Sequence, residues 1–167
     1  MQNEQDSGGL TLASPAKVNL FLRVLRKRED GYHQLASLFQ TVDLCDTLYI
    51  RLGEADRLTT KSSDVPLSAD NLIMQAVQLF RQKTGLPISA EIHLVKRIPV
   101  RAGLGGGSSN AATTLWALNQ LTGRPVTDQQ LSRWAAELGS DASSFIILLN
   151  SAVTLCTAAF FTSSRSG

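Results

Sequence analysis

Hydrophobic and polar positions alternate along the first third of the chain in the way expected of β-strands. Apolar side chains recur at every second position from Val18 to Val24, after a Ser14-Pro15 pair that predicts a turn. A charged stretch over 26–31 that ends in Asp-Gly predicts a second turn, and strand-like runs follow over 33–42 and 47–52. We therefore expect three strands before the first helix, and their short spacing favours antiparallel pairing.

The middle of the chain changes from a two-residue period to a helical one. Asp70-Asn71 precedes an apolar stripe at helical spacing, and Gly85 with Pro87 follows it, so the pattern predicts a helix between them. Alternation returns over Ile88–Lys96, which predicts a further strand.

Two more helices are expected after this strand. One covers 110–121, where apolar residues recur on one face, and the other begins at a capping box of Thr127 and Gln130 and ends at Gly139. Several strands, a helix, a strand and two helices indicate an α+β fold rather than a regular βαβ alternation.

Residues 145–161 form an uncharged run of seventeen residues near the C-terminal end. The run is short for a membrane span, polar residues interrupt it, and basic residues do not flank its N-terminal side. We therefore expect two buried strands around Asn150-Ser151, a globular protein and no membrane partner.

Composition and charge narrow the possible functions. The chain has 167 residues, 43% of them hydrophobic and 18% charged, which fits one globular domain. Sixteen basic and fourteen acidic residues leave a net charge of +2, so no strong field favours nucleic acid or an anionic membrane. Cys45 and Cys156 fit no metal or redox spacing and are expected to be reduced. The polar, acidic residues 1–9 do not resemble a secretory signal, and we expect them to be flexible.

The glycine-rich stretch 103–109 is the clearest candidate for chemistry. It joins a predicted strand directly to a predicted helix, and four of its seven residues are glycines. Glycines let backbone N–H groups converge on an anion, and the positive end of the following helix adds to the attraction. The stretch therefore predicts a phosphate-binding loop, with Ser108 and Ser109 at the helix entry.

Known phosphate motifs of other classes do not fit this loop. No Lys follows its glycines, as a P-loop requires, and Ser108 stands where the dinucleotide fingerprint needs its third glycine. A flexible Gly-Ser linker is the plain alternative, but linkers seldom join a strand directly to an amphipathic helix.

Four motifs in order resemble one family. Residues 99–109 fit the pattern Pro-x-x-x-Gly-Leu-Gly-x-x-Ser-Ser of the GHMP small-molecule kinases at every fixed position. Pro15–Leu22, Asp30–His33 and Asp70–Ile73 are similar to further motifs of the GHMP branch that acts on a cytidine diphosphate-linked methylerythritol. The resemblance runs from about Leu10 to Asp141.

The resemblance implies a fold, a reaction and a compartment. The fold is the GHMP kinase N-terminal domain, of the ribosomal protein S5 domain 2-like type, without the second domain of the family. The reaction is ATP-dependent phosphorylation of the 2-hydroxyl of the methylerythritol moiety, with Mg²⁺, in the non-mevalonate isoprenoid pathway. The partner is this small molecule rather than nucleic acid or membrane, and the place is the cytoplasm of a bacterium or the plastid stroma.

The resemblance also assigns roles to individual residues. Lys17 and Asp141 match the catalytic pair, with Asp141 either taking the acceptor proton or holding Lys17 and the hydroxyl in register. Asn19, Tyr32 and His33 match substrate contacts, with the Tyr32 ring stacking on cytosine. The metal ligands and the oligomeric state stay unassigned. The implied ATP contacts are Lys96, Pro99, Val100, Arg101, Ala102, Gly103, Leu104, Gly105, Gly106, Gly107, Ser108 and Ser109.

Beyond Asp141 the family pattern breaks. We expect a domain over 10–161 whose last part, 145–161, diverges from the family, followed by a tail over 162–167. Such a truncated chain is expected to expose apolar surface and to associate with itself. Two alternatives stay open: a nucleotide-binding fragment without turnover, and a GHMP kinase for another small alcohol.

Overall fold

A single mixed sheet and a layer of helices make up the protein in the computed structural model, which describes residues 8–27, 33–139, 141–147 and 149. The strand order is β1-β2-β4-β3, with antiparallel neighbours except for the parallel pair of β3 and β4. The elements are β1 (Leu10–Lys27), β2 (His33–Gly53), β3 (Arg57–Thr60), α1 (Leu72–Thr84), β4 (Ser89–Val95), α2 (Gly106–Leu121) and α3 (Asp128–Leu138).

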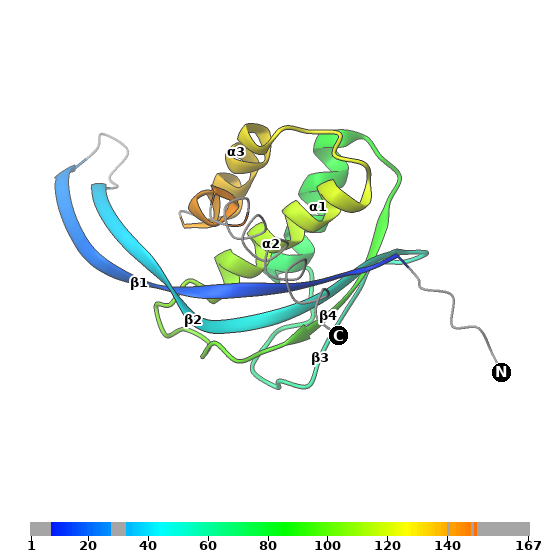
Figure 1. Ribbon diagram of the computed structural model, residues 1–167, viewed down its shortest axis with the longest axis horizontal. Coiled ribbons are helices and arrows are strands. Elements are labelled where there is room, and N and C mark those ends of the chain that lie inside the picture. The colour runs from blue at the N-terminus through cyan, green and yellow to red at the C-terminus, as the bar shows by residue number, and fades with distance from the viewer. Residues whose placement is uncertain (1–7, 28–32, 140, 148, 150–167) are drawn as a thin grey trace, which may run out of the picture.

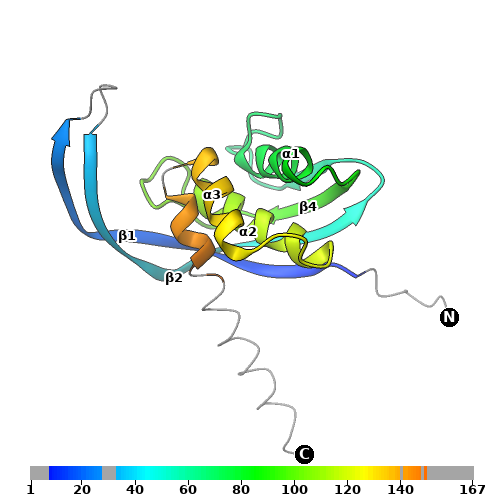
Figure 2. The same cartoon turned by 90° about the horizontal axis from the view of Figure 1, so that it is seen from above.

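Helices α1, α2 and α3 lie on one face of the sheet, so the described part has two layers (Figure 1). β1 and β2 continue well past β4, and this shared extension forms a curved arm that reaches beyond the helices (Figure 2). This arrangement is the α+β fold expected from the order of elements.

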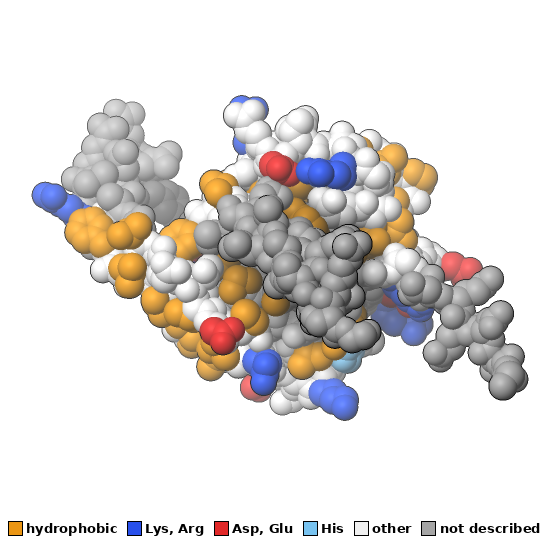
Figure 3. Space-filling view, viewed as in Figure 1, with side chains coloured by type: hydrophobic (Ala, Val, Ile, Leu, Met, Phe, Trp, Pro, Cys, Tyr) orange, Lys and Arg blue, Asp and Glu red, His pale blue; other side chains and the backbone are white. Residues whose placement is uncertain are grey.

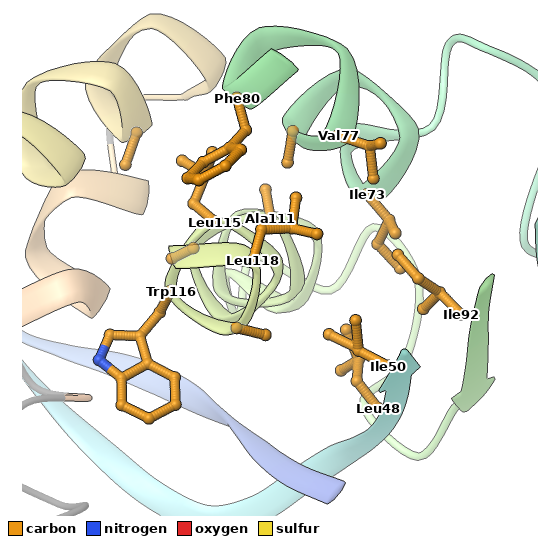
Figure 4. Close-up of a cluster of buried hydrophobic side chains, with 14 of the residues drawn as sticks. Leu48, Ile50, Ile73, Val77, Phe80, Ile92, Ala111, Leu115, Trp116 and Leu118 are labelled. Atoms are coloured by element: carbon orange, nitrogen blue, oxygen red, sulfur yellow. The ribbon is translucent and has the colours of Figure 1, made fainter. Parts of the chain in front are cut away.

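Helix α2 lies at the centre of the core, between α1 and the sheet (Figure 4). Every residue from 109 to 119 is buried, whereas α1 and α3 bury only one stripe each. The helix is rich in alanine and threonine because small side chains let neighbouring elements approach it from several sides. Side chains from α1, β2 and β4 pack around it, among them Phe80, Val77, Ile73, Leu48, Ile50 and Ile92.

Several predicted elements are confirmed. Helix α1 begins after Asn71, whose side chain accepts a hydrogen bond from the Ile73 amide, and ends at Gly85 in the left-handed conformation. Helix α3 has the predicted capping box between Thr127 and Gln130. The predicted strand 88–96 corresponds to β4.

Three predictions about the strands and α2 are wrong. The runs 33–42 and 47–52 form one strand, β2, because an irregularity in the pairing with β1 breaks the alternation without ending the strand. Ser14-Pro15 lies inside β1 for the same reason. Helix α2 begins at Gly106 rather than at residue 110, because the chain turns at its N-cap Gly105, which has the left-handed conformation, and the following glycines are already helical.

The prediction of two buried strands around Asn150-Ser151 is wrong where it can be compared. Residues 142–147 and 149 are helical, and residues 150–161 of that prediction lie outside the described residues. Phe145 and Ile146 are nonetheless buried, so the described start of the apolar run packs into the core as a helix. In the part of the chain that the structure describes, no helix has the length and apolar character needed to cross a bilayer.

Apolar side chains are exposed on the arm formed by β1 and β2. Orange side chains gather there on the face shown in Figure 3, and Leu20, Phe21 and Leu38 are 63%, 50% and 59% exposed. This finding agrees with the expected apolar surface.

Candidate active site

The glycine loop bends sharply between β4 and α2. Gly103 and Gly105 have φ of 73° and 70°, and Arg101 is a non-glycine residue with φ of 61°. Gly105 is the N-cap of α2 and offers no side-chain cap. The first amides of an α-helix have no partner within the helix, so those of Gly106 and Gly107 are available to an anion.

A pocket of about 370 Å³ lies against this loop. Its lining includes all residues from 99 to 108, and the opposite side is formed by Asp64–Pro66 and by the start of α1 at Asp70–Ile73. Leu94, Lys96 and Asn110 complete the lining. The predicted phosphate-type loop is therefore one wall of a hollow large enough for a small ligand.

The structure brings the two candidate catalytic residues together although they are far apart in sequence. Lys17 Nζ lies 3.2 Å from Asp141 Oδ2 and 3.1 Å from Asn19 Oδ1. The Lys17 side chain is only 6% exposed, whereas that of Asp141 is 39% exposed. The ammonium is thus held by two oxygen atoms while the carboxylate keeps a face open to an incoming group.

Gly105 connects this pair to the pocket. It lines the pocket, and a Cβ atom at this position would lie 3.1 Å from Lys17 Cγ and 3.3 Å from Phe145 Cε2. The backbone N–H of Lys17 also donates to the Leu104 carbonyl at 2.9 Å. Glycine is favoured at position 105 for two reasons: its φ is positive, and a side chain there would require the Lys17 stem to shift by a few tenths of an ångström.

An irregularity in the β1–β2 pairing places Lys17. Pro15 is opposite Cys45, but Ala16 is opposite Val42, so two residues of β2 fall between the registers. Side chains of consecutive residues in a regular strand point to opposite faces, yet Ala16 and Lys17 are both buried. The bulge therefore turns the lysine toward the loop and Asp141.

Lys96 was expected to contact ATP, and the structure shows it paired with a carboxylate. Its Nζ lies 2.9 Å from Asp46 Oδ2 and also donates to the Ile98 carbonyl. Asp46 is fully buried and was missed from the sequence. The sequence held one signal for it: Asp46 is two and four residues before Leu48 and Ile50, so it lies on the same inward face of the strand.

The remaining candidate residues differ in how they are placed. Ser108 lines the pocket, but Ser109 is fully buried and its hydroxyl lies 2.8 Å from Ser14 Oγ. Tyr32 lies outside the described residues, and His33 is described only as the first residue of β2, paired with Lys27. The pocket wall at 64–73 was also absent from the sequence-based set, although Asp70–Ile73 carried one of the family-like motifs.

Cys45 adjoins this region on β2. Burial raises the pKa of its thiol above the ordinary value, and the negative charges of Asp43 and Asp46 raise it further. Cys45 is a free cysteine in the described part of the chain, and Cys156 lies outside the described residues.

The comparison with known protein families agrees with this geometry. Residues 71–147, from the start of α1 to beyond Asp141, match the GHMP kinases N terminal domain. A crystal structure of 4-(cytidine 5'-diphospho)-2C-methyl-D-erythritol kinase superimposes with a TM-score of 0.69 and 40% identity over 83% of this chain. The chain carries a GHMP kinase N-terminal domain.

Two curated relatives of this GHMP kinase domain bear the same enzyme name. The chain is 53% identical over 136 residues to 4-diphosphocytidyl-2-C-methyl-D-erythritol kinase of Protochlamydia amoebophila. The aligned residues make up 81% of this chain and 47% of that relative. It is 51% identical over 139 residues to the chloroplastic enzyme of the same name from Arabidopsis thaliana. This alignment includes 81% of the chain and 36% of the relative. The chain also covers 49% of the crystallised kinase, so it spans about half the length of the bacterial relative and of that structure.

Proposed function

We propose that the protein is an ATP-dependent kinase that phosphorylates the 2-hydroxyl of 4-diphosphocytidyl-2-C-methyl-D-erythritol. The observation that carries the proposal is the Lys17–Asp141 pair, which lies beside the N-terminus of α2 and contacts the glycine loop through Gly105. Relatives at about 50% sequence identity bear the name of this kinase, which favours the cytidine-linked substrate over another small alcohol.

Each part of the site has a role in this reaction. The pocket holds ATP, and the amides of Gly106 and Gly107 bind its phosphates. Lys17 stabilises negative charge on the transferred phosphoryl group. The acceptor oxygen forms a bond to the γ-phosphorus as the bond from that phosphorus to the β,γ-bridging oxygen breaks, ADP leaves, and Asp141 takes the hydroxyl proton.

Oxygen donors at the loop suit a magnesium ion carried by the nucleotide. Mg²⁺ is usually held by few protein oxygens together with substrate phosphates. Ser108 faces the pocket, and a Cβ at Gly139, near Asp141, would lie 3.1 Å from its hydroxyl oxygen. We assign the Ser108 hydroxyl as the protein ligand, and bound Mg²⁺ would neutralise charge on the phosphates. The described residues contain no cluster of three or more metal-binding side chains of the His, Cys, Asp or Glu type.

The remaining assignments follow the same proposal. Asn19 orients Lys17 and contacts the acceptor, while Tyr32 and His33 bind the cytosine. Lys96 contributes positive charge to the pocket wall from its position beside Asp46. We assign the enzyme to the cytoplasm of a bacterium or to the plastid stroma.

The test is phosphorylation of the proposed substrate by this 167-residue chain with ATP and Mg²⁺, with ATP and CDP binding measured in parallel. We expect phosphate transfer to the cytidine-linked substrate and none to homoserine, an acceptor of another GHMP kinase. ATP binding without transfer would favour the alternative of a nucleotide-binding fragment. Failure to bind ATP would overturn the assignment of the pocket.

A further inference from the structure

Asp46 receives more polar contacts than any role in the proposed reaction explains. Its Oδ1 accepts hydrogen bonds from the backbone amides of Arg97 and Ile98 at 2.7 Å and 2.8 Å. Its Oδ2 lies 2.9 Å from Lys96 Nζ and accepts from Asn110 Nδ2 at 3.0 Å. A carboxylate with no exposed surface thus joins the strand β2, the turn after β4 and the helix α2.

Neighbouring contacts give this carboxylate a specific target, the first turns of α2. Ser14 is the cross-strand partner of Asp46, and its hydroxyl lies 2.8 Å from that of Ser109. Two adjacent positions of the sheet therefore hold two consecutive residues of the helix, Ser109 and Asn110. The amide of Asn110 is oriented by Asp46, since Nδ2 is the donor, and Oδ1 has no partner among the described residues.

The turn held by Asp46 also contacts the start of the helix. Ile98 is 1% exposed, and a Cβ atom on Gly106 would lie 3.0 Å from its Cγ2. Gly106 is the first residue of α2, whose free amide faces the phosphate region. Ile98 therefore packs closely against the residue that is expected to bind phosphate, and we expect a shift of Ile98 to disturb the position of that residue.

We propose that Asp46 is a positioning residue that holds the glycine loop in its nucleotide-binding shape before nucleotide arrives. This inference rests on the proposed function, because it assumes that the pocket binds a nucleotide. Fixed donors bind an anion more tightly than mobile ones because less conformational entropy is lost on binding. Asp46 acts on phosphate affinity through the turn over 96–98 and through Asn110.

The test compares a ligand that has phosphates with one that has none. We expect Asp46→Asn to weaken ADP binding by about tenfold, because a charge-assisted contact is lost, while adenosine binding changes by less than about twofold. Isothermal titration of the 167-residue chain gives both dissociation constants. Equal weakening of both ligands, or of neither, would overturn the positioning role.

Asp56 offers a matched control. Its carboxylate binds one backbone amide, that of Ala90 at 3.1 Å, and one cation, Arg81 at 2.8 Å. Neither of these partners lines the pocket, whereas Lys96 and Asn110, which contact Asp46, do. Asp56→Asn is expected to lower the melting temperature and leave the ratio of the ADP and adenosine dissociation constants unchanged. A changed ratio in this variant would show that the ratio reports stability alone, which would contradict the inference.

Hydrogen exchange on the unmodified chain tests the inference if Asp46→Asn does not fold. The Arg97 and Ile98 amides, although outside regular structure, are expected to exchange as slowly as the amides of β4. Exchange as fast as that of residues 101–103 would overturn the inference. Loss of ADP binding by the unmodified chain would instead contradict the proposed function, since the exchange result does not depend on a ligand.

Discussion

Two lysine–aspartate pairs flank the glycine loop, and they differ in the exposure of the acid. In the Lys17–Asp141 pair the aspartate side chain is 39% exposed, whereas in the Lys96–Asp46 pair it is fully buried. Lys17 has one further oxygen, from Asn19, while Asp46 is also bound by two backbone amides and an asparagine. The first pair is open to a substrate and the second is closed by the protein.

This difference in exposure suits Asp141 to a catalytic role and Asp46 to a structural one. A carboxylate that takes a proton during a reaction needs access to the acceptor, which Asp141 has and Asp46 lacks. A buried carboxylate that loses its partners destabilises the fold, whereas a half-exposed pair contributes little to stability. Substitutions in the two pairs should therefore change different measured quantities.

The largest effect is expected on turnover at the open pair. Asp141→Asn removes the proton acceptor but keeps the size of the side chain, and turnover should fall by roughly 10²–10⁴-fold. ATP binding should stay close to that of the unmodified chain, because the pocket lining does not include Asp141. Steady-state phosphorylation assays and ATP titration measure the two quantities.

Lys17→Ala and the double variant sharpen this prediction. Residues that act as a unit show non-additive effects, so the double variant should be hardly slower than the worse single variant. Near-normal turnover in either single variant would show that its role in the reaction is wrongly assigned.

The closed pair should dominate stability. Asp46→Ala leaves a buried lysine and three other donors without their acceptor, and the free energy of unfolding should fall by about 3–5 kcal/mol. Asp141→Ala should lower it by less than Asp46→Ala does, because the Asp141 side chain is 39% exposed and Lys17 keeps its contact with Asn19 Oδ1. Urea denaturation followed by circular dichroism compares them, and similar losses would mean that burial does not distinguish the pairs.

Contact between the open pair and the loop can be broken at Gly105. Gly105→Ala forces a Cβ against the Lys17 stem at positive φ, and we expect a loss of about 1–2 kcal/mol with reduced turnover. Gly123→Ala is the control, because φ is 82° there and nothing lies within 4 Å of the added atom. The control should lose only about 1 kcal/mol of stability and keep its turnover. Thermal denaturation measures the loss of stability, and the phosphorylation assay measures turnover. Equal turnover in both variants would contradict a role for the close packing of Gly105 against Lys17.

The smallest effect concerns Cys45, beside the closed pair. Because burial and two nearby carboxylates raise the pKa of its thiol, the reactive thiolate is scarcer than in a free cysteine at the same pH. Iodoacetamide should therefore modify Cys45 more slowly in the folded chain than in urea at pH 8, as measured by mass spectrometry of the Cys45 peptide. Equal rates would show that the thiol is not shielded.

Local patterns predicted much of the fold. The caps of α1 and α3 depend on neighbouring residues, so Asn71, Thr127 and Gln130 revealed them directly. The single long strand β2 could not be predicted, because its bulge is defined by pairing with β1 rather than by its own residues. The apolar run at 145–149 was assigned to strands because a short buried helix and a buried strand have similar composition.

In the candidate site, too, local motifs could be predicted but contacts between distant segments could not. The glycine loop and the choice of Lys17 and Asp141 came from motifs, but their 3.2 Å approach depends on the bulge and on Gly105. Asp46 and Asn110 were missed because nothing in the local pattern of either element shows which buried polar residue has a partner elsewhere in the fold. Only the packing of the sheet against α2 shows that they contact one another.

The central position of α2 links ligand occupancy to the survival of the whole domain. The helix whose first amides are expected to hold phosphate is also the most completely buried element of the core. A ligand that binds only the folded chain, present at one hundred times its dissociation constant, adds about 2.7 kcal/mol to the free energy of unfolding. A high nucleotide concentration in the cell would thereby protect this protein from proteolysis, and a low concentration would make it more susceptible.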